Sequence, residues 1–267
     1  MLQQLWETVK AVKEQAPLVH NITNYVVMNN SANALLALGA SPVMAHALEE
    51  VEDMAGIAGS LVINIGTLEP QWVEAMKKAM ITAKRKGTPI VIDPVGLGAT
   101  PYRNEAFASL IDTVKPTVIR GNGSEIMAAL STASATKGVD STISAQAATD
   151  AATELAGITN GTVCISGEED WIITSTTKAK VLNNIPLYTK VTGMGCTATA
   201  LTGACLAVTS DPFMATLAAM ATMGVVGEVA MQKAQGPGTL QLYFLDALYN
   251  LNEDTFMDKA KIEVIHE

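Results

Sequence analysis

Short apolar runs alternate along the chain with longer segments in which apolar residues recur every three or four positions. The apolar runs predict buried strands at 61–66, 88–96, 116–122 and 162–167. The helical spacing covers 70–87, 104–115, 144–158 and a segment that starts near Ser124, which we expect to be its N-cap. Strands and helices that alternate in this way predict right-handed βαβ units. We therefore expect an α/β fold with a mostly parallel central sheet covered by helices on both faces.

The remaining segments follow less regular patterns. Residues 171–184 read as a short antiparallel pair at an edge of the sheet, and the polar segment 131–146 reads as a surface loop or lid. From Cys196 to about residue 250 the pattern is mostly helical. Residues 213–231 are apolar enough to cross a membrane, but Glu228 lies among them and no aromatic or basic anchors flank them. We expect a buried helix there.

Composition narrows the class of protein. The 267 residues fit one α/β domain spanning 1–267, and 49% hydrophobic against 4% aromatic residues favours helices packed on a sheet. A net charge of -9 argues against a nucleic-acid partner. Three cysteines, Cys164, Cys196 and Cys205, form no zinc pattern, and free thiols fit a reducing cytoplasm. The N-terminal 15 residues are amphipathic and of mixed charge, unlike a signal peptide.

Polar side chains follow three of the predicted strands, where an open α/β sheet binds its ligands. Asp93 follows the second strand, Arg120, Asn122 and Glu125 follow the third, and Ser166 ends the fourth. Two carboxylates near a phosphate site suit Mg²⁺, and an arginine can fork onto phosphate oxygens. Taken singly, Asp93 is equally well explained as a turn cap before proline, and Glu125 as a partner of a helix dipole. Their positions at adjacent strand ends favour function.

A glycine turn opens the last helical region. Gly193 and Gly195 flank Met194, and Cys196 follows directly. Glycines without side chains let backbone N–H groups approach an oxyanion at a helix N-terminus. This turn is neither a P-loop nor a complete dinucleotide fingerprint, so on its own it predicts only the entry of a loop into a helix.

The order of four segments resembles the hydroxyethylthiazole kinase family, whose members act in thiamine salvage and belong to the ribokinase-like superfamily. These segments are HNITNYVVMNNSANALLALGASPVMA, VIDPVGLGAT, RGNGSEI and TGMGCTATALTGA. The resemblance extends from about residue 15 to residue 245. Most ribokinase-like enzymes have Gly-Ala-Gly-Asp at the last turn, with aspartate as the base. Here Cys196 takes that position, which is typical of thiazole kinases.

The resemblance implies a three-layer ribokinase-like fold and a reaction. ATP would phosphorylate the primary alcohol of 4-methyl-5-(2-hydroxyethyl)thiazole with Mg²⁺ as the cofactor. It implies a homotrimer whose thiazole pockets lie between subunits. It also assigns residues: Asn24, Met44 and Gly193 bind the thiazole, Arg120, Asn122 and Ser166 (where the family often has threonine) bind ATP, and Asp93 and Glu125 bind the metal.

The position of Cys196 after the turn suggests that it orients the substrate hydroxyl and accepts its proton. A helix N-terminus lowers a thiol pKa, so we expect some thiolate at neutral pH. The N–H groups of Gly193 and Gly195 would hold the transferring phosphoryl group. Cys196 could instead be a small core residue, or pair with His20 or His46 in an acyl-transfer enzyme. A kinase for a pyrimidine or pyridine alcohol and a non-catalytic thiazole-binding protein also remain open.

Overall fold

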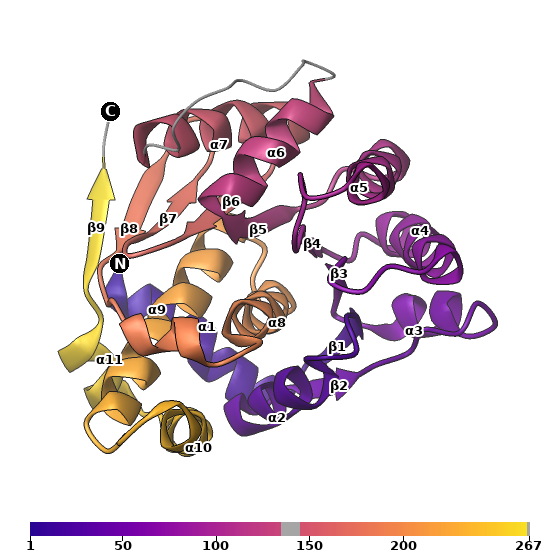
Figure 1. The fold of residues 1–267 in the computed structure, drawn as a ribbon. Helices are drawn as coiled ribbons and strands as arrows, with labels where there is room; N and C mark the ends of the chain where they lie inside the picture. Colours follow the sequence, from indigo (N-terminus) through magenta and orange to yellow (C-terminus); the bar gives the residue numbers. More distant parts are fainter. Residues whose placement is uncertain (135–144, 266–267) are drawn as a thin grey trace.

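The computed structural model describes residues 1–134 and 145–265, and a nine-stranded sheet runs through them in the order β2-β1-β3-β4-β5-β6-β7-β8-β9 (Figure 1). Strands β2 to β6 are parallel, and the pairs that follow β6 are antiparallel. The mostly parallel sheet is thus confirmed. The strands are β1 Leu18–Ile22, β2 Ser41–Val43, β3 Ser60–Asn64, β4 Ile90–Asp93, β5 Val118–Asn122, β6 Thr162–Ser166, β7 Asp170–Ile173, β8 Lys178–Val181 and β9 Ile262–Ile265.

Helices cover both faces of this sheet, which confirms the three-layer expectation (Figure 1). On one side lie α1 Leu2–Gln15, α2 Met28–Leu38, α8 Met194–Leu206, α9 Pro212–Met231, α10 Pro237–Tyr249 and α11 Glu253–Lys259. On the other lie α3 Val51–Ile57, α4 Pro70–Lys86, α5 Pro101–Thr113, α6 Gly123–Ala133 and α7 Ala145–Thr159. A short 3₁₀ helix, Pro186–Lys190, precedes α8.

Alternation along the strands decides which side chains meet α8. Four buried strand residues pack into the core that contains α8 and α9: Val62, Val91, Val118 and Cys164. Their neighbours along the chain pack into the core of the opposite face. Side chains on a strand repeat with a period of two, so the residues two positions further on face α8 as well. These are the polar residues at the strand ends: Asn64, Asp93, Arg120 and Ser166.

Helix boundaries follow local chemistry closely. Helix α4 starts at Pro70 and ends before Gly87, whose φ of 74° is left-handed, as the predicted range 70–87 requires. Helix α6 corrects one expectation. Its N-cap is Asn122 and not Ser124, because Asn122 accepts from the N–H of Glu125 and the Glu125 carboxylate accepts from the N–H of Asn122. This reciprocal capping box leaves Ser124 inside the first turn.

Three other expectations from the sequence can be compared with the structure. Residues 171–184 do contain an antiparallel pair, β7 and β8, but β9 pairs with β8, so β9 is the edge strand and not the predicted pair. The helical region after Cys196 is three helices, and α9 is mostly buried as expected for 213–231, although its length and composition would suit a membrane span. Most of the loop or lid predicted at 131–146 lies outside the described residues.

Candidate active site

Asp93 lies among polar side chains at the carboxyl ends of the strands. It is 2% exposed, and its Oδ2 accepts hydrogen bonds from Thr199 Oγ1 at 2.7 Å and Asn64 Nδ2 at 3.0 Å. Nη1 of Arg120 lies 3.9 Å from the same oxygen. Burial raises the pKa of Asp93 to about 6, because the loss of hydration outweighs the opposing charge of Arg120. The site therefore holds a carboxylate whose negative charge is only partly compensated.

Asn64 and Asn24 connect Asp93 to the thiol of Cys196. Asn24 Nδ2 donates to Asn64 Oδ1 at 2.8 Å and to Cys196 Sγ at 3.6 Å. Asn24 Oδ1 accepts from the backbone N–H of Val26 at 3.1 Å. Both asparagines are buried, whereas Cys196 is only partly so. A continuous path of amides thus runs from the carboxylate to the sulfur.

The expected ionisation of Cys196 is wrong. We expected the N-terminus of α8 to lower its pKa. Burial and the charge of Asp93 instead raise the pKa of Cys196 to about 11, against smaller lowering effects of Asn64, Asn24 and Arg120. At neutral pH this side chain is a neutral thiol. The other two cysteines, Cys164 and Cys205, are buried in the core.

The glycine turn opens α8 as predicted, and its geometry requires glycine. Gly193 is the N-cap with a φ of 86°, and a Cβ there would lie 2.9 Å from Cγ1 of Val27. A Cβ on Gly195 would lie 3.0 Å from Nη1 of Arg120. Within the part of the chain that the structure describes, no side chain caps the first N–H groups of α8. The helix start therefore offers free N–H donors beside a guanidinium group, an arrangement that suits an anion.

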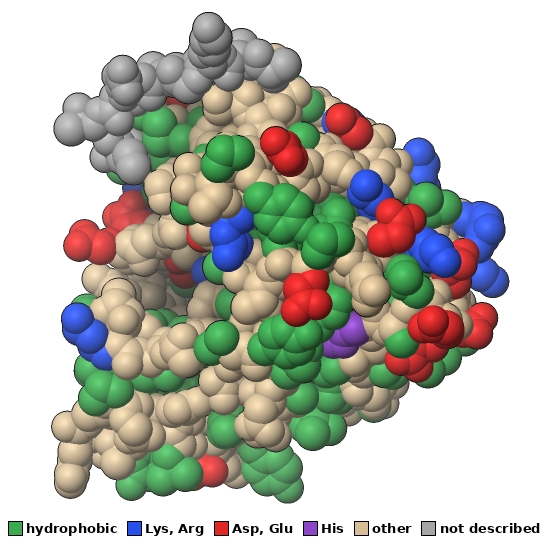
Figure 2. Space-filling view, turned by 45° about the vertical axis from the view of Figure 1, so that its right-hand side comes forward, with side chains coloured by type: hydrophobic (Ala, Val, Ile, Leu, Met, Phe, Trp, Pro, Cys, Tyr) green, Lys and Arg blue, Asp and Glu red, His purple; other side chains and the backbone are tan. Residues whose placement is uncertain are grey.

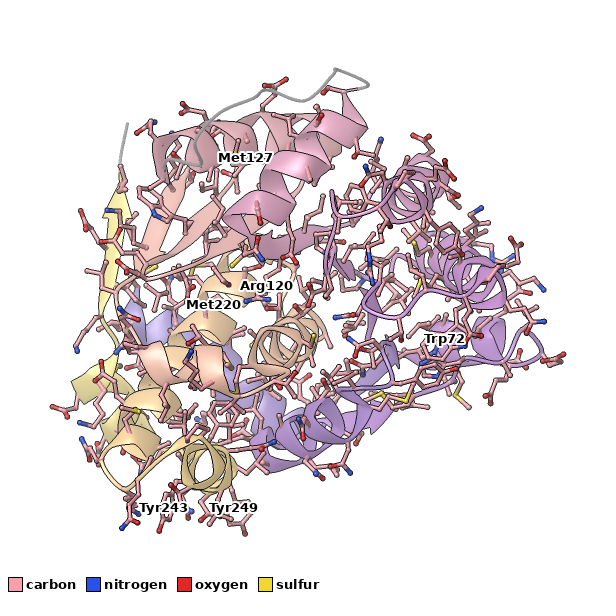
Figure 3. All side chains as sticks on the ribbon, viewed as in Figure 1. Trp72, Arg120, Met127, Met220, Tyr243 and Tyr249 are labelled. Carbon is pink, nitrogen blue, oxygen red and sulfur yellow. The ribbon has the colours of Figure 1, made fainter. Side chains whose placement is uncertain are left out.

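Arg120 also borders a cleft of about 560 Å³ between the sheet and α9. Its Nη2 donates to Ser166 Oγ, and Gly195 and Met220 line the same cleft. Figure 3 shows Arg120 and Met220 close together, whereas Trp72, on α4, lies apart from them near α3. The polar end of the cleft thus meets the start of α8, and its other end is apolar.

A further carboxylate, the half-buried Asp170 at the start of β7, also lines this cleft. Its Oδ1 accepts from the N–H of Gly167 at 3.1 Å, and burial raises its pKa to about 6 against the charge of Arg120. Asp170 was not predicted from the sequence because it begins a strand, whereas the predicted site residues lie at or after the carboxyl ends of strands.

Asn122 and Glu125 have structural partners in addition to any ligand. The two oxygens of Glu125 accept from the N–H groups of Gly96 and Asn122, each at 2.9 Å. Glu125 therefore has a structural role at the start of α6, which was the alternative expectation for this residue. The charge of Glu125 still contributes to the raised pKa of Asp93, which places the two carboxylates in one electrostatic environment.

Met44 and the histidines lie at the β1–β2 end of the sheet. The backbone oxygen of Met44 bonds to His46 Nδ1 at 2.7 Å, and the N–H of Thr23 donates to His46 Nε2 at 3.3 Å. His20 is buried and its Nε2 bonds to the oxygen of Ala45 at 2.9 Å. Within residues 1–134 and 145–265, neither histidine bonds to Cys196, so the arrangement gives no support to Cys–His acyl transfer.

Asn64 and Thr199 are site residues that the sequence analysis did not single out. Asn64 ends a buried strand, in register with Asp93, so the rule that selected Asp93 would have selected Asn64 too. Thr199 lies one helical turn after Gly195, on the face that looks towards the strand ends. A search at helical spacing from the glycine turn would have found it.

Comparison with known proteins agrees with this geometry. Residues 9–254 match the hydroxyethylthiazole kinase family. The hydroxyethylthiazole kinase of Syntrophus aciditrophicus is 55% identical over 97% of both chains, and that of Leptospira biflexa is 52% identical over 97% of both.

Solved structures give the same picture. The hydroxyethylthiazole kinase protein of Pyrococcus horikoshii superposes with a TM-score of 0.92 at 41% identity, covering 99% of this chain and 100% of that one. Pyridoxal kinase from Staphylococcus aureus, with 18% identity, a TM-score of 0.67 and coverage of 93% and 97%, shares the fold alone. The glycine turn with its cysteine, the carboxylates at the strand ends and these full-length matches lead to one conclusion: the chain belongs to the hydroxyethylthiazole kinase family and is a phosphotransferase.

Proposed function

We propose that the protein transfers the γ-phosphoryl group of ATP to the primary alcohol of 4-methyl-5-(2-hydroxyethyl)thiazole, in the salvage of thiamine. One observation carries this proposal: the start of α8 stands between the cleft that Arg120 and Ser166 border and the amides that reach Cys196. A triphosphate in the cleft would bring its terminal phosphate to the free N–H groups at Gly193 and Gly195. An alcohol beside Cys196 would then be in position to attack it.

Cys196 would orient the alcohol and accept its proton as the new bond forms. Phosphoryl transfer proceeds through a loose transition state, so positioning contributes more than early removal of the proton. The thiol is mainly protonated because burial, and after it the charge of Asp93, raise its pKa. Neutralising Asp93 would lower that pKa and enlarge the thiolate fraction, which accepts the proton, while the neutral thiol orients the alcohol.

Mg²⁺ fits the residues present. Asp93 is a buried carboxylate with a raised pKa, so it would gain from a nearby cation, and its two hydrogen bonds both end on Oδ2. Among the described residues no group of three or more acidic, histidine or cysteine side chains forms a ready metal site. That fits an ion held by few carboxylates together with phosphates. Asp93 would hold it directly and Glu125 would add its charge, and the ion would neutralise the phosphate oxygens.

The family also implies a homotrimer with thiazole pockets between subunits, and an apolar surface supports that assembly here. Tyr25 is 56% exposed and Val26 is 61% exposed, directly after the buried Asn24. The ring of Trp72 packs at a tilt against the rings of both Tyr25 and His46, with centroid distances of 4.6 and 4.3 Å. Figure 2 shows apolar side chains gathered around a histidine on this face. A neighbouring copy that covered them would close the side of the pocket beyond Asn24, next to Met44.

We also propose that residues 1–267 form one domain that works in the cytoplasm. The single continuous sheet supports the first point, and the free thiols support the second. Neither ATP nor the thiazole needs a basic surface for binding, so the net charge of -9 is compatible with both.

A coupled assay that measures ADP release in the presence and absence of the thiazole tests the proposal. We expect turnover that requires both the thiazole and Mg²⁺, with the phosphorylated alcohol identified by mass spectrometry. A panel of pyrimidine and pyridine alcohols tests the neighbouring kinase activities. Preference for one of those alcohols would replace the substrate, and thiazole binding without ADP release would indicate a binding protein instead.

A further inference from the structure

Asn64 is a buried amide whose polar atoms are all engaged within the site. It is 1% exposed and ends β3 in register with Asp93 on β4. Its Nδ2 donates to Asp93 Oδ2 at 3.0 Å. Its Oδ1 accepts from Asn24 Nδ2 at 2.8 Å and from the N–H of Gly66 at 2.9 Å. The side chain thus touches groups on both sides of the site, the carboxylate and the amide that reaches the sulfur.

These partners leave the Asn64 amide one orientation. A carboxylate only accepts hydrogen bonds, so the NH₂ group must face Asp93, while the N–H of Gly66 requires the oxygen on the other side. That oxygen takes one N–H of Asn24 and leaves the second N–H to point at Cys196 Sγ. Asn24 is packed against Gly66, where a Cβ would lie 2.5 Å from its Nδ2. The charge of Asp93 therefore dictates, through two amides, which atom faces the sulfur.

We propose that Asn64 is a positioning residue that fixes the thiol of Cys196 relative to the carboxylate of Asp93. The proposal rests on the function proposed above, in which the alcohol lies beside the sulfur and the phosphate lies near the carboxylate. Asn64 holds both reacting ends through one rigid amide, so that the sulfur always meets a hydrogen-bond donor. The charged groups that act on this thiol are Asp93 and Arg120, and the neighbouring amides are Asn64 and Asn24.

Thr199 provides a matched control. Its Oγ1 donates to the same Asp93 Oδ2 at 2.7 Å, and to the oxygen of Gly195 at 3.3 Å. It supports the carboxylate as Asn64 does, but it donates to neither Asn24 nor Cys196. Thr199→Val keeps the shape of the side chain and removes only the hydroxyl. Asn64→Asp keeps the shape of the amide and replaces the donor to Asp93 by a second carboxyl oxygen.

The experiment compares wild type, Asn64→Asp and Thr199→Val in two measurements. The first is the rate at which iodoacetamide alkylates Cys196 at a fixed, slightly alkaline pH, followed by mass spectrometry of the peptide. The second is the steady-state kinetics, with KM for the thiazole and for ATP determined separately. Thermal unfolding confirms that each variant is folded. Alkylation needs no turnover, so a wild type that fails to phosphorylate the thiazole would refute the proposed function and leave the alkylation comparison valid.

We expect Asn64→Asp to slow alkylation by about tenfold, because two facing carboxyl groups at positions 64 and 93 repel each other, which displaces the oxygen that holds Asn24 and turns the Asn24 N–H away from the sulfur. Asn64→Asp should also raise KM for the thiazole. Thr199→Val should leave the alkylation rate and KM for the thiazole within about twofold of wild type, and should change only KM for ATP. If Asn64→Asp fails to fold, Asn24→Asp removes the donor to sulfur from the other side and should slow alkylation equally. The proposal would be overturned if Asn64→Asp and Thr199→Val changed the alkylation rate and KM for the thiazole equally, or if Asn64→Asp left the alkylation rate unchanged.

Discussion

Burial beside a single arginine sets the charge state of Asp93. Its pKa is raised to about 6, so in the folded chain it holds a proton more tightly than in the unfolded chain. Stability from this group is therefore greatest at acidic pH and is lost as the pH rises through about 4 to 6. Such a cost is expected of a carboxylate kept for binding a cation, since catalysis and stability favour different side chains there.

Asp93→Asn should remove this cost. Relative to wild type, the variant should gain stability on the order of 1.4 kcal/mol more at about pH 8 than at about pH 5. Urea denaturation at the two pH values measures the difference, and comparison with wild type cancels the contribution of other groups. Phosphoryl transfer should be lost at both pH values. A variant whose relative stability falls with rising pH would show that Arg120 outweighs burial.

Cys196 allows a second test at one side chain. Replacing Cys196 by Ala should lower kcat by about tenfold or more, since the alcohol loses the group that orients it and takes its proton. Asp at position 196 should be tolerated better than Ala, because a carboxylate can accept the same proton. Circular dichroism establishes that both variants keep the fold. Wild-type kcat in the alanine variant would rule out the role proposed for the thiol.

The residue at which a helix starts depends on which polar side chain accepts a hydrogen bond from its free backbone N–H groups. At α6 two candidates stand two residues apart, Asn122 and Ser124, and the sequence pattern favoured the wrong one. Asn122 wins because Glu125 stands three residues later and returns the hydrogen bond, and because Ser124 Oγ donates to Asn122 Oδ1 at 2.6 Å. The same asparagine, predicted to bind ATP, is thus required for the helix that carries Glu125.

Asn122→Ala should destabilise the protein by about 1 to 2 kcal/mol, the usual cost of losing an N-cap. Ser124→Ala, as the matched control, should change the unfolding free energy by less than about 0.5 kcal/mol, since Ser124 caps nothing. Urea unfolding curves at constant pH provide both values. Comparable losses in the two variants would mean that the capping box does not hold α6 in place.

Particular elements show how much of the fold could be predicted from the sequence. Apolar runs bounded by glycine or proline located β3 to β6 and α4, because burial on both faces leaves a strong local signal. Strand β9 was missed because an edge strand four residues long carries little apolar pattern and depends on β8 for its position. The pKa of Cys196 was missed for a similar reason: a helix N-terminus is visible in sequence, whereas burial beside Asp93 is not.

Distant parts of the chain meet around the cleft. Asn183 lines it, and its amide donates to Glu228 Oε1 and to the oxygen of Lys259, both at 2.8 Å, while its own oxygen accepts from the N–H of Lys261 at 3.0 Å. The backbone at the end of α11 and before β9 therefore fixes Asn183, which forms part of one wall of the cleft. A chain end to which the family resemblance assigned nothing thus takes part in shaping the cleft that we propose binds the nucleotide.

The assembly that we propose would affect the opposite side of the site, at the β1–β2 end of the sheet. Val26 follows the site residue Asn24 directly and exposes 61% of its surface among aromatic side chains. A glutamate there would leave the folded subunit intact, because most of the Val26 side chain is exposed and the backbone N–H of residue 26 can still donate to Asn24 Oδ1. It would place a charge in the surface that we propose neighbouring copies cover, and burying an unpaired charge is costly.

Val26→Glu should therefore convert the trimer to monomers in sedimentation velocity and raise KM for the thiazole by about tenfold, with KM for ATP much less affected. Ile158→Glu is the control: Ile158 is 37% exposed on α7, at the other end of the sheet, and should change neither quantity. Both variants should keep the thermal unfolding profile of a folded chain. A monomeric wild type, or a Val26 variant that remains trimeric with an unchanged KM for the thiazole, would show that this apolar surface does not complete the pocket.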